Sequence, residues 1–413
     1  MTHPFSPPFW SDPAPILVLG TGAALPGEPI SSEESLTAVE GRFGLALHRR
    51  GMAIAHKLEI RTCHLCRNMR ARLEAPRKGH RNPELAAIAV QRALGEAGLA
   101  VHDLSYLIGH TATPARLMLP NIGQVAELLD YGGPFVEFRQ ACTGFANALV
   151  FAQGLLRASA GPIAIVGSET GSVFFDPVRA AEDAGQLVNM VQMGDGAAAI
   201  ILTRDDDRVG PRLSHVYYGQ IGRGRVPGLT VADGGSYTPR CSIGFPEFQH
   251  DFAAIHRSGL ELLLHCAAAA ERTGGGAADY VLPHQANGRM DTILARPLGL
   301  AAERIIVTAG RLGNTGSAAM WLALAQVRAT LKLRDRVAIS LLALVPAVQI
   351  VLFGYAVYLD PKNVPIAIAG SDGSFVERAA RIVGETGYFR IMGKALPSGS
   401  AERIGRDRAA AFS

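Results

Sequence analysis

The chain has 413 residues, of which 48% are hydrophobic and 18% charged, so it can bury a large interior. That length exceeds one ordinary core and predicts two domains or one duplicated fold. The formal net charge of +4 is mild for this length, which argues against a nucleic-acid-binding protein but leaves room for a local basic patch facing an acidic partner.

Five cysteines at irregular spacings argue against a disulfide framework. The proline-rich segment 1–15 contains no apolar core run and does not read as a signal peptide. These features favour a protein of the reducing cytoplasm.

The first half alternates short apolar runs with helical patterns. Strands are predicted at 16–20, 104–109, 163–167 and 197–202, and helices at 83–98, 121–129 and 142–158. The charged run 205–208 indicates the surface boundary of this half.

The second half repeats the order, with strands predicted at 213–219, 280–282 and 304–307, helices at 252–272, 285–295 and 314–331, and two final strands within 337–359. A faint internal repeat supports duplication, because 85–110 and 260–284 both run from a helix through glycine and aspartate to an apolar strand and a histidine. Such alternation predicts sheets covered by helices on both faces. The expected architecture is an α/β fold of five layers, αβαβα, with halves 1–205 and 206–360 and a C-terminal extension 361–413.

The segment 337–359 carries no charge and is long enough to cross a bilayer. Pro346 in mid-span and the β-branched content favour two adjacent buried strands instead. We therefore expect no membrane span.

Three short segments, each placed where a predicted strand gives way to a helix, supply a thiol, an imidazole and a carboxamide. Ligands in open α/β sheets bind at such junctions. A helix N-terminus also lowers a thiol pKa from its usual value of about 8.5. The segments are Ala141-Cys142-Thr143-Gly144-Phe145, Pro283-His284-Gln285-Ala286-Asn287 and Gly313-Asn314-Thr315-Gly316-Ser317.

Each of these residues taken alone has an ordinary structural explanation. Cys142 could be a small buried apolar side chain, His284 a satisfied histidine at a strand end, and Asn314 a helix N-cap. Their joint occurrence favours one active site with Cys142 as the nucleophile.

In this order and at these separations, the three segments resemble the Cys-His-Asn set of the thiolase superfamily, in particular the β-ketoacyl-acyl-carrier-protein synthase III family. Further matching segments are spread over most of 14–359, among them Gly20-Thr21-Gly22, Thr111-Ala112-Thr113-Pro114, Gly167-Ser168-Glu169-Thr170 and Met193-Gly194-Asp195-Gly196. The resemblance implies a duplicated thiolase-like fold with two mixed sheets. It also implies that Cys142 takes an acyl group while His284 and Asn314 stabilise the enolate formed when a malonyl thioester loses CO2, as an oxyanion hole does.

The resemblance extends to partners. It implies that Arg289, which follows His284 by five residues, helps to dock an acidic acyl carrier protein, with Arg257 and Asn287 as further candidates for carrier or substrate binding. The alternative for Arg289 is a solvated helix face. Leu119 falls where relatives close the acyl pocket of the partner subunit, so a homodimer is implied. The expected substrates are an acyl thioester, carried by coenzyme A or by carrier protein, and a malonyl thioester, with no cofactor.

Two departures from the family pattern concern the substrate. Relatives complete an acyl oxyanion hole with a backbone N–H of a Gly-rich turn, where this chain has Pro346, which has no N–H. Relatives that take acyl-coenzyme A stack its adenine on a tryptophan, but the only tryptophans here are Trp10 and Trp321, outside the corresponding region 41–66. A basic insert, 41–78, replaces that feature. An acyl-carrier-protein donor and a specialised pathway are therefore favoured.

Two other functions stay open. One is acyl transfer to oxygen or nitrogen, or the coupling of two acyl chains, although the glutamate of head-to-head condensing relatives has no counterpart in Ala115-Arg116-Leu117-Met118. The other is an inactive partner subunit of a condensing heterodimer, against which the retained Cys142 argues.

The pair Cys63-x-x-Cys66 lacks the second ligand pair of a structural zinc site. We therefore predict no metal.

Overall fold

A computed structural model describes residues 9–158, 161–204, 208–219, 224–231, 233–240, 246–272, 278–330, 364–369, 377 and 389–395. The chain divides into two compact units, Met1–Val357 and Tyr358–Ser413. The first predicted half, 1–205, and residues 206–357 of the second fall in the first unit.

A six-stranded mixed sheet forms the centre of the first unit. Strand β5 is parallel to its neighbours β6 and β7, whereas β8 runs antiparallel to both β7 and β2. The two central strands β7 and β8 are buried along their length except at Arg204, as expected where both faces are covered. The spatial order is β6 (Phe135–Phe138), β5 (Tyr106–His110), β7 (Ile163–Glu169), β8 (Gly196–Arg204), β2 (Ile16–Ala24) and β9 (Arg212–Leu213).

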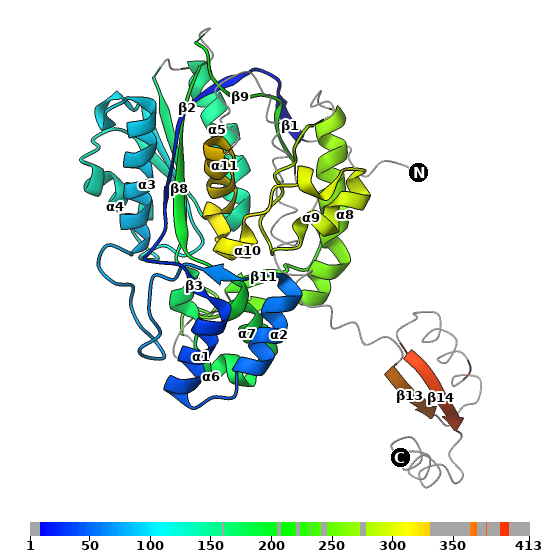
Figure 1. The fold of residues 1–413 in the computed structure, drawn as a ribbon. Helices are drawn as coiled ribbons and strands as arrows, with labels where there is room; N and C mark the ends of the chain where they lie inside the picture. Colours follow the sequence, from blue (N-terminus) through cyan, green and yellow to red (C-terminus); the bar gives the residue numbers. More distant parts are fainter. Residues whose placement is uncertain are drawn as a thin grey trace. The chain divides into compact units, whose positions relative to one another are not determined.

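Helices cover both faces of this sheet (Figure 1). Helices α3 (Asn82–Ala97) and α4 (Asn121–Leu129) lie on one face, and α5 (Gly144–Ala158) and α11 (Ala319–Thr330) lie on the other. Because α5 belongs to the first predicted half and α11 to the second, the two halves share one layer.

The approach of α3 to the sheet depends on two glycines of β2. A Cβ at Gly20 would lie 2.3 Å from the carbonyl oxygen of Ala93, and one at Gly22 would lie 2.1 Å from that of Ala89. No side chain fits at these distances. The segment Gly20-Thr21-Gly22 therefore serves close helix-on-sheet packing.

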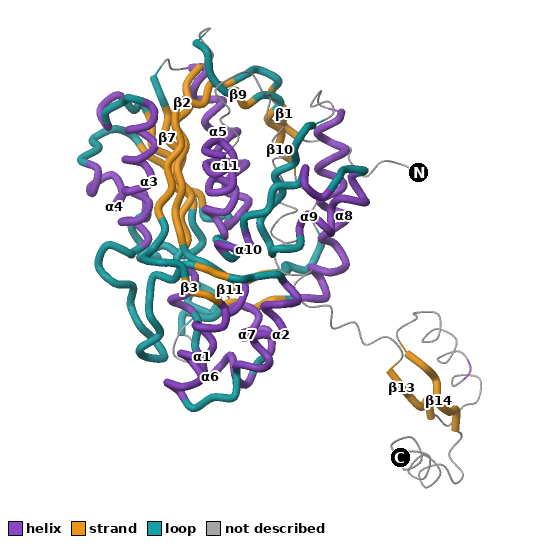
Figure 2. Tube along the Cα trace, viewed as in Figure 1, coloured by secondary structure: helices purple, strands orange, loops and turns teal. Residues whose placement is uncertain are grey.

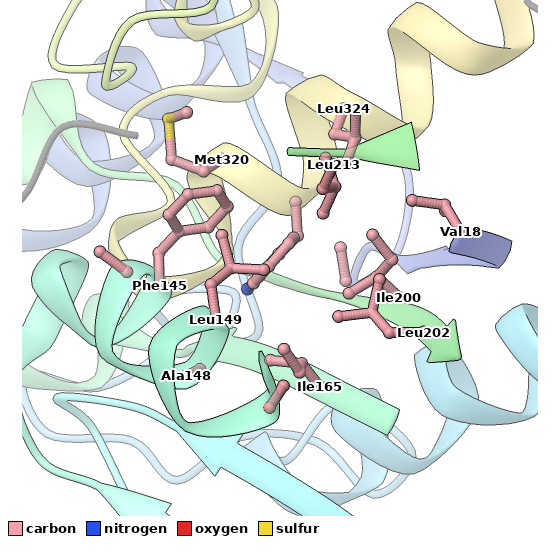
Figure 3. Close-up of a cluster of buried hydrophobic side chains, with 14 of the residues drawn as sticks. Val18, Phe145, Ala148, Leu149, Ile165, Ile200, Leu202, Leu213, Met320 and Leu324 are labelled. Atoms are coloured by element: carbon pink, nitrogen blue, oxygen red, sulfur yellow. The ribbon is translucent and has the colours of Figure 1, made fainter. Parts of the chain in front are cut away.

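The core between the sheet and the α5/α11 layer is apolar and closed (Figure 3). Phe145 and Leu149 of α5 and Met320 of α11 face Ile165 and Ile200 of the sheet, and all five side chains are buried. Because one core is built from both halves, the sheet rigidly positions the ends of α5 and α11, where the candidate site lies.

Beyond α5 and α11 the described chain is mainly loop, followed by two outer helices, α8 (Phe252–Arg272) and α9 (Met290–Leu298) (Figure 2). Strand β10 (Val216–Gly219) pairs antiparallel with β1 (Phe9–Asp12), and β11 (Leu229–Val231) with β12 (Phe248–His250). In the described residues, the strands predicted at 280–282 and 304–307 reduce to one parallel bridge, Val281 to Ile305.

Two predicted helices begin later than expected. The helix predicted at 285–295 starts at Met290, because Asn287 Oδ1 accepts a hydrogen bond from the Arg289 N–H (2.9 Å) and Gly288 N–H donates to the Leu58 carbonyl (2.8 Å), which hold this stretch as a loop. The helix predicted from Asn314 starts as a 3-10 turn, η5 (Gly316–Ala318), before α11.

The sequence patterns predicted no helix between β2 and α3, but the structure has two helices there. Helix α1 (Ser32–Phe43) begins with a capping box in which Ser31 and Glu34 bond each other, a readable signal. It precedes α2 (His48–Leu58), which lies within the basic insert, and the pair β3 (Ile30–Ser31) and β4 (Thr62–Cys63). Three further short helices are α6 (Pro177–Glu182), α7 (Ala184–Gln192) and α10 (Ala309–Leu312).

The two strands predicted in 337–359, with Pro346, lie outside the described residues. In the second unit, β13 (Val364–Ala369) and β14 (Phe389–Ala395) form a parallel pair. Of the helices in the part of the chain that is described, none is long and apolar enough to cross a bilayer.

Candidate active site

Cys142 lies in a strained turn between β6 and α5. The 3-10 turn η2 (Ala141–Thr143) runs directly into α5, so the thiol sits at the N-terminal end of a long helix. Ala141 has a φ of 45°, a left-handed conformation that costs an alanine about 1–2 kcal/mol. The thiol is buried, with 5% of the residue exposed. A strained residue before a buried thiol at a helix start is typical of a positioned nucleophile.

His284 lies in a loop that side chains, rather than regular structure, hold in place. Gln285 Nε2 donates to the carbonyl oxygens of Pro283 (2.7 Å) and Ile306 (3.0 Å). Its Oε1 accepts from the Thr308 N–H (2.6 Å). This amide joins the histidine loop to the segment leading to α10, and His284 is fully buried.

Asn314 is fixed by its backbone, which leaves its amide nitrogen available. Its N–H donates to the Gln192 carbonyl (2.8 Å) and its carbonyl accepts from the Gly194 N–H (3.1 Å). Asn314 Oδ1 accepts from the Gly316 N–H (3.0 Å). Gly313 has a φ of 68°, and a Cβ there would lie 2.8 Å from Gly194 N, so glycine is required before Asn314.

Gln192 and the turn η2 bring the three segments together. Gln192 accepts the Asn314 N–H through its carbonyl, and its Nε2 donates to the Ala286 carbonyl (2.5 Å), two residues after His284. The turn that holds Cys142 packs against η5, which follows Asn314. The structure thus gathers all three residues at the ends of α5 and α11.

The site contains buried polar atoms without partners. Within the described part of the chain, neither ring nitrogen of His284 nor Asn314 Nδ2 has a hydrogen-bond partner, and the same holds for Asn287 Nδ2. Buried polar groups in proteins are nearly always paired. Their occurrence together on the histidine and asparagine segments indicates a place where a polar substrate group binds.

Burial sets the charge state of the site. Burial lowers the pKa of His284 to about 3, so its ring is neutral near pH 7. Burial, followed by the negative charge of Glu169, raises the pKa of the Cys142 thiol well above its usual range, although its backbone hydrogen bond lowers it. The expected lowering by the helix N-terminus was therefore wrong for the free protein: desolvation outweighs the helix.

Glu169, at the end of β7, is a site residue whose role the sequence did not reveal. Its Oε2 accepts from the Ser317 N–H (3.0 Å), and its Oε1 accepts from the Ala112 N–H (3.2 Å) and from the Thr113 hydroxyl. It thereby fastens the loop after β5 to η5 beside Cys142. A Cβ at Gly316 would lie 2.5 Å from Glu169 Oε2, which explains the glycine in the asparagine segment.

The residues expected to bind a carrier lie in different environments. Arg289 is about half exposed, with its Nε 4.0 Å from Glu59 Oε1 at the end of α2. Burial and the charge of Arg289 lower the pKa of Lys57, so these two cations are close. Asn287 is 1% exposed and binds the Arg289 backbone. It therefore lies within the loop, and its expected part in substrate or carrier binding stays a prediction.

Arg257 lies in α8, but its side chain is outside the described residues. Leu119, by contrast, lies in an exposed apolar run. Leu117 is 79% exposed, Met118 is 83% exposed and Leu119 is 61% exposed. Leu119 has a φ of 68°, a strained backbone that presents this loop outward.

The Cys63-x-x-Cys66 segment is a buried structural element. The Cys66 N–H donates to Asp195 Oδ2 (2.7 Å), and the Cys66 thiol lies 3.2 Å from the Ser172 hydroxyl. Burial and Asp195 raise the pKa of Cys63 to about 12. Among the described residues, no group of three or more His, Cys, Asp or Glu side chains could hold a metal ion.

Matches to a known protein family fall on the two parts of the chain that contain the candidate site residues. The family described as 3-oxoacyl-[acyl-carrier-protein] synthase III matches residues 136–220, which hold Cys142, and its C-terminal part matches 270–344, which hold His284 and Asn314. A β-ketoacyl-[acyl-carrier-protein] synthase III from Rhizorhabdus wittichii is 30% identical over 320 residues, covering 75% of this chain and 88% of that protein. The chain belongs to the 3-oxoacyl-[acyl-carrier-protein] synthase III family.

Solved structures agree with this membership. AbyA1, described as a tetronic acid condensing enzyme, aligns with a TM-score of 0.66 and 26% identity over 76% of this chain and 92% of its own. A synthase III from Pseudomonas aeruginosa aligns with a TM-score of 0.59 and 22% identity over 78% and 91%. These neighbours confirm the thiolase-like α/β fold predicted from the sequence. As a synthase III family member, the protein is an acyl-transferring condensing enzyme.

Proposed function

We propose that this synthase III family member catalyses a decarboxylative Claisen condensation in two stages. The Cys142 sulfur first attacks an acyl thioester, forming a new thioester at Cys142 and releasing the donor thiol. A malonyl thioester then loses CO2, and the resulting enolate carbon attacks the Cys142-bound carbonyl. The Cys142–acyl bond breaks, which frees the thiolate and releases a β-ketoacyl thioester.

The observation that carries this proposal is the set of unpartnered buried donors beside the thiol. A neutral imidazole and a carboxamide can both donate to the thioester oxygen, where decarboxylation builds negative charge. The low pKa of His284 keeps the ring neutral. Asn314 contributes no charge that would repel the enolate, as an aspartate would.

The high pKa of the Cys142 thiol requires a proton acceptor for the first stage. The departing donor thiolate can take this proton, so the first stage exchanges one thiol for another and balances without a separate base. No cofactor enters this scheme.

We further propose that an acyl carrier protein delivers at least one substrate to the cations beside the histidine loop. Lys57 and Arg289 form a basic pair there, and acidic partners are attracted to such surfaces. Two relatives are themselves named β-ketoacyl-[acyl-carrier-protein] synthase III. The donor's carrier and acyl length stay open in this proposal.

A homodimer is the proposed assembly, because the exposed run Leu117, Met118 and Leu119 is too apolar for a solvent-facing loop. The cytoplasm is the proposed location, because the four described cysteines are all free thiols.

Intact-protein mass spectrometry tests the reaction. Wild type, Cys142→Ala and the matched control Cys266→Ala, a buried cysteine on α8, are incubated with a panel of acyl thioesters and then with a malonyl carrier protein. The proposal expects an acyl adduct on wild type and on the control but not on Cys142→Ala. It also expects loss of the adduct with formation of a β-ketoacyl carrier protein. An adduct that persists with malonyl thioester contradicts the condensation.

A second candidate function is acyl coupling in specialised metabolism, which the likeness to AbyA1 favours. In that case the adduct clears with an alcohol, amine or second acyl acceptor rather than with malonyl thioester. If no acyl donor labels Cys142, both functions fail and an inactive partner subunit becomes the better description.

A further inference from the structure

Behind the Cys142 turn, a histidine and a tryptophan form a buried hydrogen-bonded pair. His110 ends β5 and Trp321 lies on α11, and each is 1% exposed. Trp321 Nε1 donates to His110 Nε2 at 2.7 Å. An indole N–H can only donate, so Nε2 of His110 is the acceptor and the neutral ring carries its proton on Nδ1.

The protonated edge of His110 faces the start of α5. A Cβ added to Gly144, two residues after Cys142, would lie 2.8 Å from His110 Nδ1. Among the described residues, His110 Nδ1 has no hydrogen-bond partner of good geometry. Burial lowers the pKa of His110 to about 3, an effect that the nearby Ala141 backbone partly offsets. The ring is therefore neutral at pH 7.

The pair is closely packed from every described side. A Cβ at Gly167 would lie 2.8 Å from both His110 Nε2 and Trp321 Cδ1. The Trp321 ring lies against Phe145, with ring centroids 4.1 Å apart. Such packing leaves the imidazole no room to flip, so its proton stays directed at the turn that contains the strained Ala141.

We infer that His110, held in its Nδ1-protonated tautomer by Trp321, is a positioning residue that packs against Gly144 beside the strained Ala141 and thereby fixes the Cys142 sulfur at the start of α5. A left-handed alanine persists only where its surroundings determine it. Asn314 is held separately, by its own backbone hydrogen bonds to Gln192 and Gly194.

This inference rests on the proposed role of Cys142 as nucleophile, and it separates two partial activities. Loss of the pair displaces the Cys142 sulfur. It does not touch the His284 loop, which Gln285 and Gln192 hold independently. Acylation and alkylation of Cys142 therefore depend on His110, and decarboxylation of a malonyl thioester without an acyl donor does not.

Three variants test the pair. His110→Leu removes both ring nitrogens, His110→Asn keeps a donor near the Nδ1 position, and Trp321→Phe removes only the indole N–H while keeping a ring against Phe145. The readouts are the rate of Cys142 alkylation by iodoacetamide at pH 8, followed on the Cys142 peptide, and the rate of malonyl-thioester decarboxylation. Circular dichroism and the melting temperature check the fold of each variant.

For His110→Leu we expect alkylation and acylation of Cys142 to slow by about 100-fold, the effect of an atomic misplacement of about 1 Å. Decarboxylation should stay within about twofold, since that loop is untouched. Trp321→Phe should fall between wild type and His110→Leu, and His110→Asn should recover most of the loss.

Two outcomes overturn the inference: alkylation at the wild-type rate in His110→Leu and Trp321→Phe, or an equal fall of alkylation and decarboxylation, which indicates a general packing role. If His110→Leu does not fold, Trp321→Phe alone decides. Alkylation needs no acyl substrate, so a failure of the proposed reaction is seen separately, as an inactive wild type whose Cys142 still responds to these changes.

Discussion

The nucleophile turn and the histidine loop are positioned by different means. Cys142 is placed by backbone geometry, a strained Ala141 running into the long helix α5. His284 has no such helix behind it, and the amides of Gln285 and Gln192 hold its loop instead. The buried pair of His110 and Trp321 packs behind the first region, whereas the two amides hold the second. The two partial reactions should therefore respond to different substitutions.

The largest expected effect is at Asn314, whose replacement separates the two stages. Asn314→Asp removes the free amide donor and adds negative charge beside the enolate. Decarboxylation should fall by about 1000-fold, the upper range for one oxyanion-hole donor. Acylation of Cys142 should stay within about threefold, a small change in free energy. Single-turnover assays with acyl and malonyl thioesters measure each stage, and equal loss in both contradicts the separation.

Gln285 offers the next test, because it holds the histidine loop through buried bonds to Pro283, Ile306 and Thr308. Gln285→Met keeps the side-chain length but leaves these groups unpaired. We expect decarboxylation to fall by about 100-fold and the free energy of unfolding to drop by about 3 kcal/mol, while alkylation of Cys142 is retained. Gln285→Glu, which keeps the acceptor, should preserve more of the fold in urea titrations.

Both regions contain a buried neutral histidine, which makes stability depend on pH. The pKa values of His110 and His284 are lowered to about 3 by burial. The unfolded chain binds protons more readily, so stability is complete above about pH 6.5 and is lost as pH falls towards 3. Between pH 6.5 and 5, each histidine should cost about 2 kcal/mol. Urea unfolding at these pH values measures the loss, and His110→Asn should reduce it.

A smaller effect is expected at Glu169, whose charge raises the pKa of the Cys142 thiol. Glu169→Gln removes that charge, so the pKa should fall and alkylation should begin at lower pH. At pH 8 the alkylation rate should rise, because a lower pKa increases the fraction of thiolate. The pH profile of iodoacetamide labelling measures this change. An unchanged profile means that desolvation alone raises the pKa of the Cys142 thiol.

The smallest effect concerns the surface pair Lys57 and Arg289. The double change to Gln should raise the KM for a malonyl carrier protein by about fivefold at low salt, with kcat unchanged, and the difference should shrink as salt rises. Lys78→Gln, an exposed cation elsewhere in the basic insert, is the control. An equal rise for the control contradicts a localised docking site.

Periodicity predicted much of the fold because buried strands and amphipathic helices leave local signals. Helices Asn121–Leu129 and Phe252–Arg272 match their predicted bounds. The start of α9 could not be predicted from the pattern, because contacts of Asn287 and Gly288 with other parts of the loop and with Leu58 stop the helix. The capping box at the start of α1 is a local signal from which this helix could have been predicted.

The identities of the site residues could be predicted from the sequence, but their environment in the folded protein could not. Motif order brought Cys142, His284 and Asn314 to attention, and the structure gathers their segments. The pKa of the thiol depends on burial and on Glu169, which comes from another strand, so the lowering predicted from the helix start alone was wrong. His110 and Trp321 lie far apart in sequence, and nothing local reveals their hydrogen bond.

The buried, protonated thiol of Cys142 also bears on the chemical durability of the enzyme. Peroxides oxidise thiolates rather than thiols, and exposed sulfur faster than buried sulfur. A resting enzyme whose nucleophile is both protonated and 5% exposed should therefore survive oxidative stress without a dedicated repair partner. Covalent inhibitors that depend on a reactive resting thiolate should also label it slowly, so a warhead carried on a thioester-like scaffold is the better choice.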